Sequence, residues 1–221
     1  MQIHIITAFP EMFDSTFSKS ILKRAQEQDL ISIETHNIRD WTSDNYKTID
    51  HRPYGGGAGM VMMIEPIYKA VKDIKNKVGN KKTLVLLTSA KGEIFTQKHA
   101  RDFSEFEVMI FICGHYEGVD ERVNEHIADL EISIGKYVLT GGEIPAMVIT
   151  DAVTRLIPGV LGNEESIENE SFTNNEKTEA PQYTRPERFI TEEGEEWRVP
   201  GILLSGNHKE IEAWRSSKSN Y

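Results

Sequence analysis

Three short segments of the chain combine glycines with charged and aromatic residues in a way that packing alone does not require. They are 52–60 (RPYGGGAGM), 113–122 (CGHYEGVDER) and 133–145 (SIGKYVLTGGEIP). Glycine adopts positive φ angles easily and lets a ligand approach the main chain closely. Together the segments predict a pocket walled largely by backbone amides and carbonyls, which would suit a nucleoside-like molecule.

More familiar interpretations of these segments do not fit their spacing. The glycines at 55–57 match neither a phosphate-binding P-loop nor a dinucleotide-binding fingerprint that opens a helix after the first strand. Cys113, His115 and Glu117 alternate like metal ligands on one strand face, but glycines interrupt the run and no second ligand cluster appears. We therefore predict no metal site, and interpret Cys113 as a small buried hydrophobe. Glu117 and Arg155 fit an ordinary ion pair and a catalytic role about equally well.

The elements that would position these segments follow from the hydrophobic pattern. Strands are predicted at 3–7, 31–35, 83–87, 108–112 and 130–134. Helices are predicted at 18–28, 66–78, 96–103, 120–126 and 145–156. Residues 39–59 are polar and then glycine-rich, which predicts a long functional loop. The alternation of strands and helices predicts an α/β domain with a mainly parallel sheet.

Composition limits the cellular setting and the partners. The chain has 221 residues and one cysteine, so no intramolecular disulfide can form, and we expect a cytoplasmic protein. No apolar run approaches the length that a membrane helix needs. A net charge of −10 argues against a broad phosphate footprint and leaves either no nucleic-acid partner or a local basic patch. The basic residues available for such a patch are Arg185, Arg188, Arg198, Lys209, Arg215 and Lys218.

The chain changes character after its last strong helical pattern. Residues 158–181 show little periodicity and are rich in Glu, Asn and Thr, and 202–215 predict a small tail ending in a helix. We predict a main domain over 1–160, a mobile linker over 161–181 and a small C-terminal region over 182–221.

Read together, the motifs resemble those of one family. Besides the three segments above, the matching motifs are 9–13 (FPEMF), 50–51 (DH), 155–162 (RLIPGVLG), 181–186 (PQYTRP) and 203–208 (LLSGNH). In this order they resemble the bacterial tRNA (guanine-N1)-methyltransferases, knotted SPOUT enzymes that methylate guanine 37 next to the anticodon. The resemblance implies a SPOUT α/β fold with a deep trefoil knot and a small helical C-terminal appendage. It also implies a homodimer with shared active sites, tRNA as partner and no membrane association.

The same resemblance assigns ligands to individual residues. S-adenosylmethionine would be held by Leu87, Thr88, Ser89, Ala90, Gly114, Tyr116, Glu117, Gly118, Ser133, Ile134, Gly135, Tyr137, Leu139, Gly141, Gly142 and Pro145. Substrate tRNA would contact Asp50, Arg52, Gly55, Arg185, Ser205 and His208, the last three in the C-terminal region.

The resemblance also implies the catalytic residues. Glu170 would act as general base toward guanine N1, and Arg155 would stabilise the charge that develops on O6. The chain departs from the family pattern at three places: Glu170 replaces the usual aspartate, 87–90 reads LTSA where tyrosine and proline are frequent, and His115 replaces an arginine. Longer members continue beyond the position of Tyr221 with basic helices, so we expect weaker tRNA binding. Magnesium is a family expectation that no ligand cluster here supports.

Two other functions are compatible with these motifs. One is a related knotted methyltransferase with a different RNA target. The other is a non-catalytic dimer that binds adenosine-like ligands or RNA. The presence of Arg155 and of a carboxylate at position 170 argues against the second.

Overall fold

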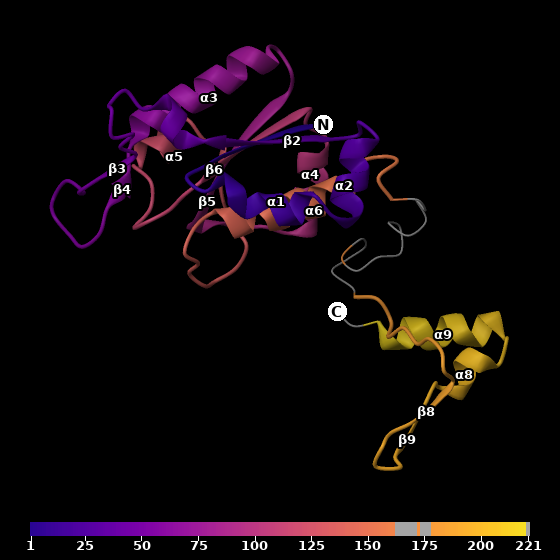
Figure 1. The fold of residues 1–221 in the computed structure, drawn as a ribbon. Coiled ribbons are helices and arrows are strands. Elements are labelled where there is room, and N and C mark those ends of the chain that lie inside the picture. The colour runs from indigo at the N-terminus through magenta and orange to yellow at the C-terminus, as the bar shows by residue number, and fades with distance from the viewer. Residues whose placement is uncertain (162–171, 173–177, 220–221) are drawn as a thin grey trace. The chain divides into compact units, whose positions relative to one another are not determined.

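The architecture was examined in a computed structural model, which describes residues 1–161, 172 and 178–219. The chain divides into two compact units, Met1–Gly162 and Asn163–Tyr221, each of which is described by itself (Figure 1).

The first unit is built around a parallel sheet. In the described part of this unit, five strands are hydrogen-bonded in the order β2-β1-β6-β5-β7. Their bounds are β1 (Gln2–Thr7), β2 (Ser32–Asn37), β5 (Thr83–Ile94), β6 (Val108–Cys113) and β7 (Leu130–Ser133). Every pairing in this sheet is parallel, and β6, between β1 and β5, is buried at each residue. The predicted α/β fold is confirmed, and the knot stays a prediction.

Helices cover both faces of the sheet (Figure 1). Their bounds are α1 (Asp14–Phe17), α2 (Ser20–Glu27), α3 (Ile64–Val78), α4 (Gln97–Ser104), α5 (Arg122–His126) and α6 (Glu143–Thr154), with 3-10 turns η1 (Pro10–Phe13) and η2 (Ile38–Trp41). Buried residues of α2, α4 and α6 belong to one hydrophobic cluster, and those of α3 and α5 to another. Helices α2, α3 and α6 bury the apolar stripes that their periodicity predicted.

Helix α3 shows how local sequence sets these bounds. Pro66 stands in the first turn, where its missing N–H costs nothing. Ile67 and Ile74 are fully buried. The helix ends at Gly79, whose φ of 68° is a conformation that side chains disfavour.

The structure corrects two sequence-based boundaries. Residues 39–59 are not all loop, because η2 overlaps their start and β3 (Asp50–His51) pairs with β4 (Val61–Met62). Ile38 and Ile49 anchor this region in the core with 0% and 2% exposure. Strand β5 does not end at Leu87 but continues to Ile94, because β7 pairs with it on both sides of a register shift between Thr88 and Glu93.

The second unit is small and carries much of its apolar surface exposed. It contains a hairpin of β8 (Arg188–Ile190) and β9 (Glu196–Arg198), followed by α8 (Gly201–Leu204) and α9 (His208–Lys218). The hairpin was missed by the sequence analysis because its strands are only three residues long and flank a glutamate-rich turn. Phe189 packs on Trp197 across it, with ring centroids 5.7 Å apart.

Most of the predicted 161–181 linker lies outside the described residues. None of the helices in the described part of the chain has the length and apolar character needed to span a bilayer.

Candidate functional site

A pocket of about 230 Å³ opens at the carboxyl ends of β6 and β7, beside the middle of β5. Three stretches, 87–91, 114–121 and 133–142 without Lys136, form its wall together with Asn124, Glu131 and Pro145. In parallel α/β sheets this edge is where ligands bind, because the loops that leave neighbouring strands converge there.

All sixteen residues assigned to S-adenosylmethionine by resemblance lie on this wall. They come from three segments separated in sequence, and the parallel order of β6, β5 and β7 brings them together.

The wall also holds residues that the sequence analysis did not assign. They are Lys91, His115, Val119, Asp120, Glu121, Asn124, Glu131, Val138 and Thr140. Most of them lie inside the segments that carried the resemblance, so whole segments would have been the better prediction. Lys91 lies in the extension of β5 beside β7, which the hydrophobic pattern did not indicate.

Packing alone already requires a glycine at position 142. A side-chain carbon at this position would overlap the hydroxyl of Thr88 and lie 2.8 Å from the amide nitrogen of Gly114. The Gly142 amide donates to the Gly114 carbonyl at 2.7 Å, which closes the third wall segment onto the second. At Gly141 a side-chain carbon would overlap the carboxylate of Glu143 and lie 2.7 Å from His115 Nδ1.

The second wall segment is bonded to the glycine loop at 52–60. The Glu117 amide donates to the Met60 carbonyl at 3.0 Å, and the Met62 amide donates to the Gly118 carbonyl at 3.0 Å. Tyr116, directly before these bonds, holds a φ of 61°, a conformation that is uncommon outside glycine and clusters at functional sites. The loop bearing Gly55 and the pocket wall are therefore joined through their backbones.

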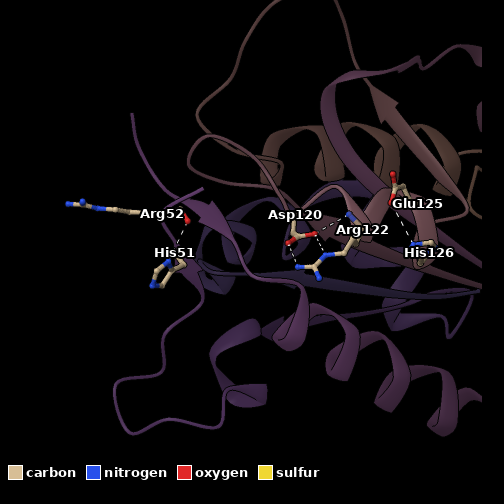
Figure 2. A network of polar contacts seen from close by, with 6 residues as sticks. All are labelled: His51, Arg52, Asp120, Arg122, Glu125 and His126. Carbon is tan, nitrogen blue, oxygen red and sulfur yellow. Dashed lines mark hydrogen bonds and ion pairs between the residues drawn. The ribbon is translucent and has the colours of Figure 1, made fainter. Parts of the chain in front are cut away.

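The predicted tRNA residues of this loop differ in exposure. Asp50 is half-buried where β3 pairs with β4, and Gly55 has a φ of 83° with open space around it. Arg52 is exposed and points away from Asp120 and Arg122 (Figure 2).

Charged groups give the pocket a negative rim. Glu117, Asp120, Glu121 and Glu131 line it, against one lysine, Lys91. Arg122 donates to both carboxylate oxygens of Asp120, at 2.8 and 2.7 Å (Figure 2), and this hydrogen bonding lowers the pKa of Asp120. A hydrogen bond from Asn124, and then the contact with Lys91 at 3.3 Å, lower the pKa of Glu121.

A buried polar group lies beneath the pocket floor. Glu143, 2% exposed at the start of α6, accepts a hydrogen bond of 2.7 Å from the Thr7 hydroxyl at the end of β1. Burial, and then the charge of Glu143, raise the pKa of Cys113 well above that of a free thiol. A thiol held protonated is a poor nucleophile, which agrees with the interpretation of Cys113 as a buried hydrophobe.

The two predicted catalytic residues are not brought to the pocket by the described part of one chain. Arg155 caps the C-terminal end of α6, whereas the N-terminal end of that helix adjoins the pocket. A helix of 12 residues is about 18 Å long. Glu170 lies outside the described residues.

The remaining residues predicted to contact tRNA belong to the second unit. Arg185 is exposed before a cis bond to Pro186. The Ser205 hydroxyl donates to the Ile202 carbonyl at 2.8 Å and accepts from the Asn207 amide at 3.1 Å, so it organises the turn between α8 and α9. His208 is exposed and begins α9.

The fold and the pocket define an α/β protein with a pocket beside its parallel sheet, walled in part by glycine-rich loops. Comparison with known proteins narrows this class. The family described as tRNA (Guanine-1)-methyltransferase TrmD matches residues 1–221, and the chain belongs to this family of enzymes.

Relatives named tRNA (guanine-N(1)-)-methyltransferase match over almost the whole chain. The protein of Carboxydothermus hydrogenoformans is 56% identical over 220 residues, covering 99% of this chain and 83% of its own. That of Staphylococcus carnosus is 51% identical over 215 residues, covering 97% and 84%. That of Bacillus cereus is 50% identical over 219 residues, covering 99% and 87%.

Proposed function

We propose that the protein transfers a methyl group from S-adenosylmethionine to N1 of guanine 37 in tRNA. The observation that carries this proposal is the convergence of all sixteen donor residues on one pocket, in a chain that belongs to this family.

The chemistry of the pocket suits the proposed donor. S-adenosylmethionine supplies an electrophilic methyl group on a positively charged sulfur, and its amino group carries a second positive charge. The carboxylates of Glu117 and Glu131 on the pocket wall complement a cation. Backbone groups of the three wall stretches, two of them glycine-rich, offer the donors and acceptors that an adenine edge requires.

The methyl transfer needs a base and a fixed positive charge. Guanine N1 carries a proton and becomes nucleophilic only when that proton leaves. In our proposal the proton passes to the Glu170 carboxylate, N1 bonds to the methyl carbon, and the carbon–sulfur bond breaks to leave a neutral thioether. Negative charge gathers on guanine O6 as N1 loses its proton, and the Arg155 guanidinium stabilises it.

A second copy of the chain would complete the site. Arg155 and the pocket adjoin opposite ends of α6, about 18 Å apart along the helix axis, so one chain's arginine does not line its own pocket. Apolar side chains on and beside α6 are also exposed: Tyr137, Val138, Ile144 and Val148 are 56%, 86%, 45% and 43% accessible. Such a patch next to a pocket is typical of a surface that a partner covers. Light scattering at micromolar concentration should therefore find a dimer, and a single species of 25.1 kDa would contradict this proposal.

Methyl transfer to unmodified tRNA transcripts tests the function. Transcripts with guanine at position 37 should accept one methyl group, which nuclease digestion should place on N1, and matched transcripts with adenine there should not react. Equal transfer to both transcripts would refute the assignment and favour a different RNA target. Donor binding by calorimetry without any methyl transfer would favour the non-catalytic alternative.

A further inference from the structure

A cluster of three potential metal ligands lies on the sheet, outside the lining of the donor pocket. His4 belongs to β1, and Glu34 and His36 belong to β2. The parallel register pairs His4 with Glu34 and Ile6 with His36, so the three side chains are neighbours across two strands. His4 Nδ1 lies 3.0 Å from His36 Nε2 and 3.8 Å from Glu34 Oε2, and His36 Nε2 lies 4.0 Å from the same oxygen.

We propose that His4, Glu34 and His36 form a binding site for a divalent transition-metal ion, for which Zn²⁺ is the natural probe. The point equidistant from three atoms with these separations lies about 2.1 Å from each of them. Zinc binds imidazole nitrogen at about 2.0–2.1 Å and carboxylate oxygen at about 2.0–2.2 Å. The three ligand atoms are therefore already spaced closely enough to reach one ion.

The donor set selects the kind of metal. Two imidazoles and one carboxylate are a known zinc combination that leaves a fourth position for water. Magnesium and calcium prefer oxygen ligands and would gain little from the two histidines. This site is therefore distinct from any magnesium requirement of the methyl transfer.

Without a metal, the two histidines share a hydrogen bond. Their ring centroids are 5.2 Å apart with an interplanar angle of 24°, so at a nitrogen separation of 3.0 Å the rings meet edge to edge. To bind an ion, the donating ring must move its proton to its other nitrogen, and both rings must turn toward the metal. The second side-chain torsion of histidine is soft enough for such a turn.

Nearby charges and solvent exposure affect how tightly this site would bind a metal ion. Burial is the largest effect on both imidazoles and lowers the pKa of each, so both are neutral near pH 7 and offer lone pairs without losing a proton first. Lys77 and Lys81 oppose a cation, but Lys77 is paired with Asp73 at 2.9 Å. The Glu34 side chain is 60% exposed, which gives an ion and its water a path from solvent.

The site would have a structural effect on the sheet. Strand β2 is an edge strand, hydrogen-bonded to β1 alone within the described sheet. A metal held by one residue of β1 and two of β2 would cross-link these strands. Sequence analysis missed the cluster because its members are far apart in sequence and meet only through the strand register.

Metal binding by the full chain tests the proposal. After treatment with a chelator and dialysis, calorimetric titration with Zn²⁺ should show one ion per chain, and Co²⁺ at the same site should give visible absorption. Loss of groups that merely orient metal ligands weakens binding about 10- to 100-fold. Glu34→Gln and His36→Gln remove ligands, so each should weaken Zn²⁺ binding at least tenfold.

The matched control is His126→Asn. His126 and Glu125 form an exposed histidine–carboxylate pair 3.6 Å apart (Figure 2), without a second histidine. This change should leave Zn²⁺ affinity unaltered. Zn²⁺ should also raise the melting temperature of the wild type but not that of the Glu34→Gln/His36→Gln double variant.

Three results would overturn the proposal: no saturable Zn²⁺ binding by the wild type, unchanged affinity in both single variants, or an equal loss in the control. Both test positions lie on an edge strand and are partly or largely exposed, so their effects do not depend on altering the core. His4→Asn changes a buried residue and serves only as a supporting variant.

Discussion

Replacing Thr7 by valine should expose the energetic role of the buried Glu143 carboxylate. The substitution keeps the shape of the side chain but removes a hydroxyl that donates to Glu143 Oε1 at 2.7 Å and accepts from the Phe9 amide at 2.9 Å. Thr7 is 0% exposed and Glu143 is 2% exposed, so water cannot replace the lost bond without rearrangement. Hydrogen bonds to charged groups contribute about 1.5–3 kcal/mol, and a buried group left without its partner costs about as much.

We therefore expect Thr7→Val to reduce the free energy of unfolding by about 2–3 kcal/mol. For a domain of this size each kcal/mol shifts the melting temperature by about 2–4 °C, so the first unit should melt roughly 4–12 °C lower, as followed by circular dichroism. Thr48→Val is a matched control, because the Thr48 hydroxyl donates to Asp44 at 2.8 Å in an exposed pair. The control should melt like the wild type, since water replaces its lost bond. Equal shifts in the two variants would refute the reasoning from burial.

Three further predictions concern catalysis and pH. Arg155→Ala should lower the rate of methyl transfer about 10²- to 10³-fold with little change in donor affinity, because the arginine acts where charge develops; an equal loss of donor affinity, measured by calorimetry, would contradict this role. Glu170→Gln should lower the rate of methyl transfer roughly 10²- to 10⁴-fold without changing the melting temperature. The control Glu168→Gln should transfer methyl groups at the normal rate. Equal, near-normal rates in the two variants would mean that another residue is the base. Burial lowers the pKa of His4 and His36 from 6.5, so the unfolded chain binds more protons and the free energy of unfolding should fall as pH drops below about 6.5. With a chelator present, His36→Gln should flatten the slope of unfolding free energy against pH. An unchanged slope would show that the two histidines are not its source.

The sequence predicted the sheet well because its signal is local and redundant. Val108 to Ile112 form a continuous apolar run that suits only a strand buried on both faces, and β6 is such a strand. The extension of β5 was missed because residues after Thr88 are exposed or only partly buried and hold their conformation through pairing with β7. Register of this kind is a long-range property that no window of sequence contains.

The donor pocket was predictable only in part from the residues themselves. Glycines beside charged side chains indicated a backbone-walled pocket, but the resemblance was needed to name the ligand. At Gly142 the structure adds a requirement that the sequence did not indicate, because a side chain would collide with Thr88 and Gly114. Three-dimensional crowding of this kind has no signature in the order of residues. The functions assigned to Glu170 and Arg155 stay predictions.

The backbone bonds between 60–62 and 117–120 make the glycine loop and the pocket wall parts of one hydrogen-bonded ribbon. If tRNA engages the loop and the donor occupies the pocket, each ligand meets a surface whose conformation the other has already biased. Equilibrium linkage then requires reciprocity: the factor by which donor changes tRNA affinity equals the factor by which tRNA changes donor affinity. A thermodynamic cycle with S-adenosylhomocysteine, which cannot react, and an anticodon stem-loop would measure this factor from either side. If this factor is one, the ribbon does not couple the two sites. If it is larger than one, each substrate raises the affinity for the other.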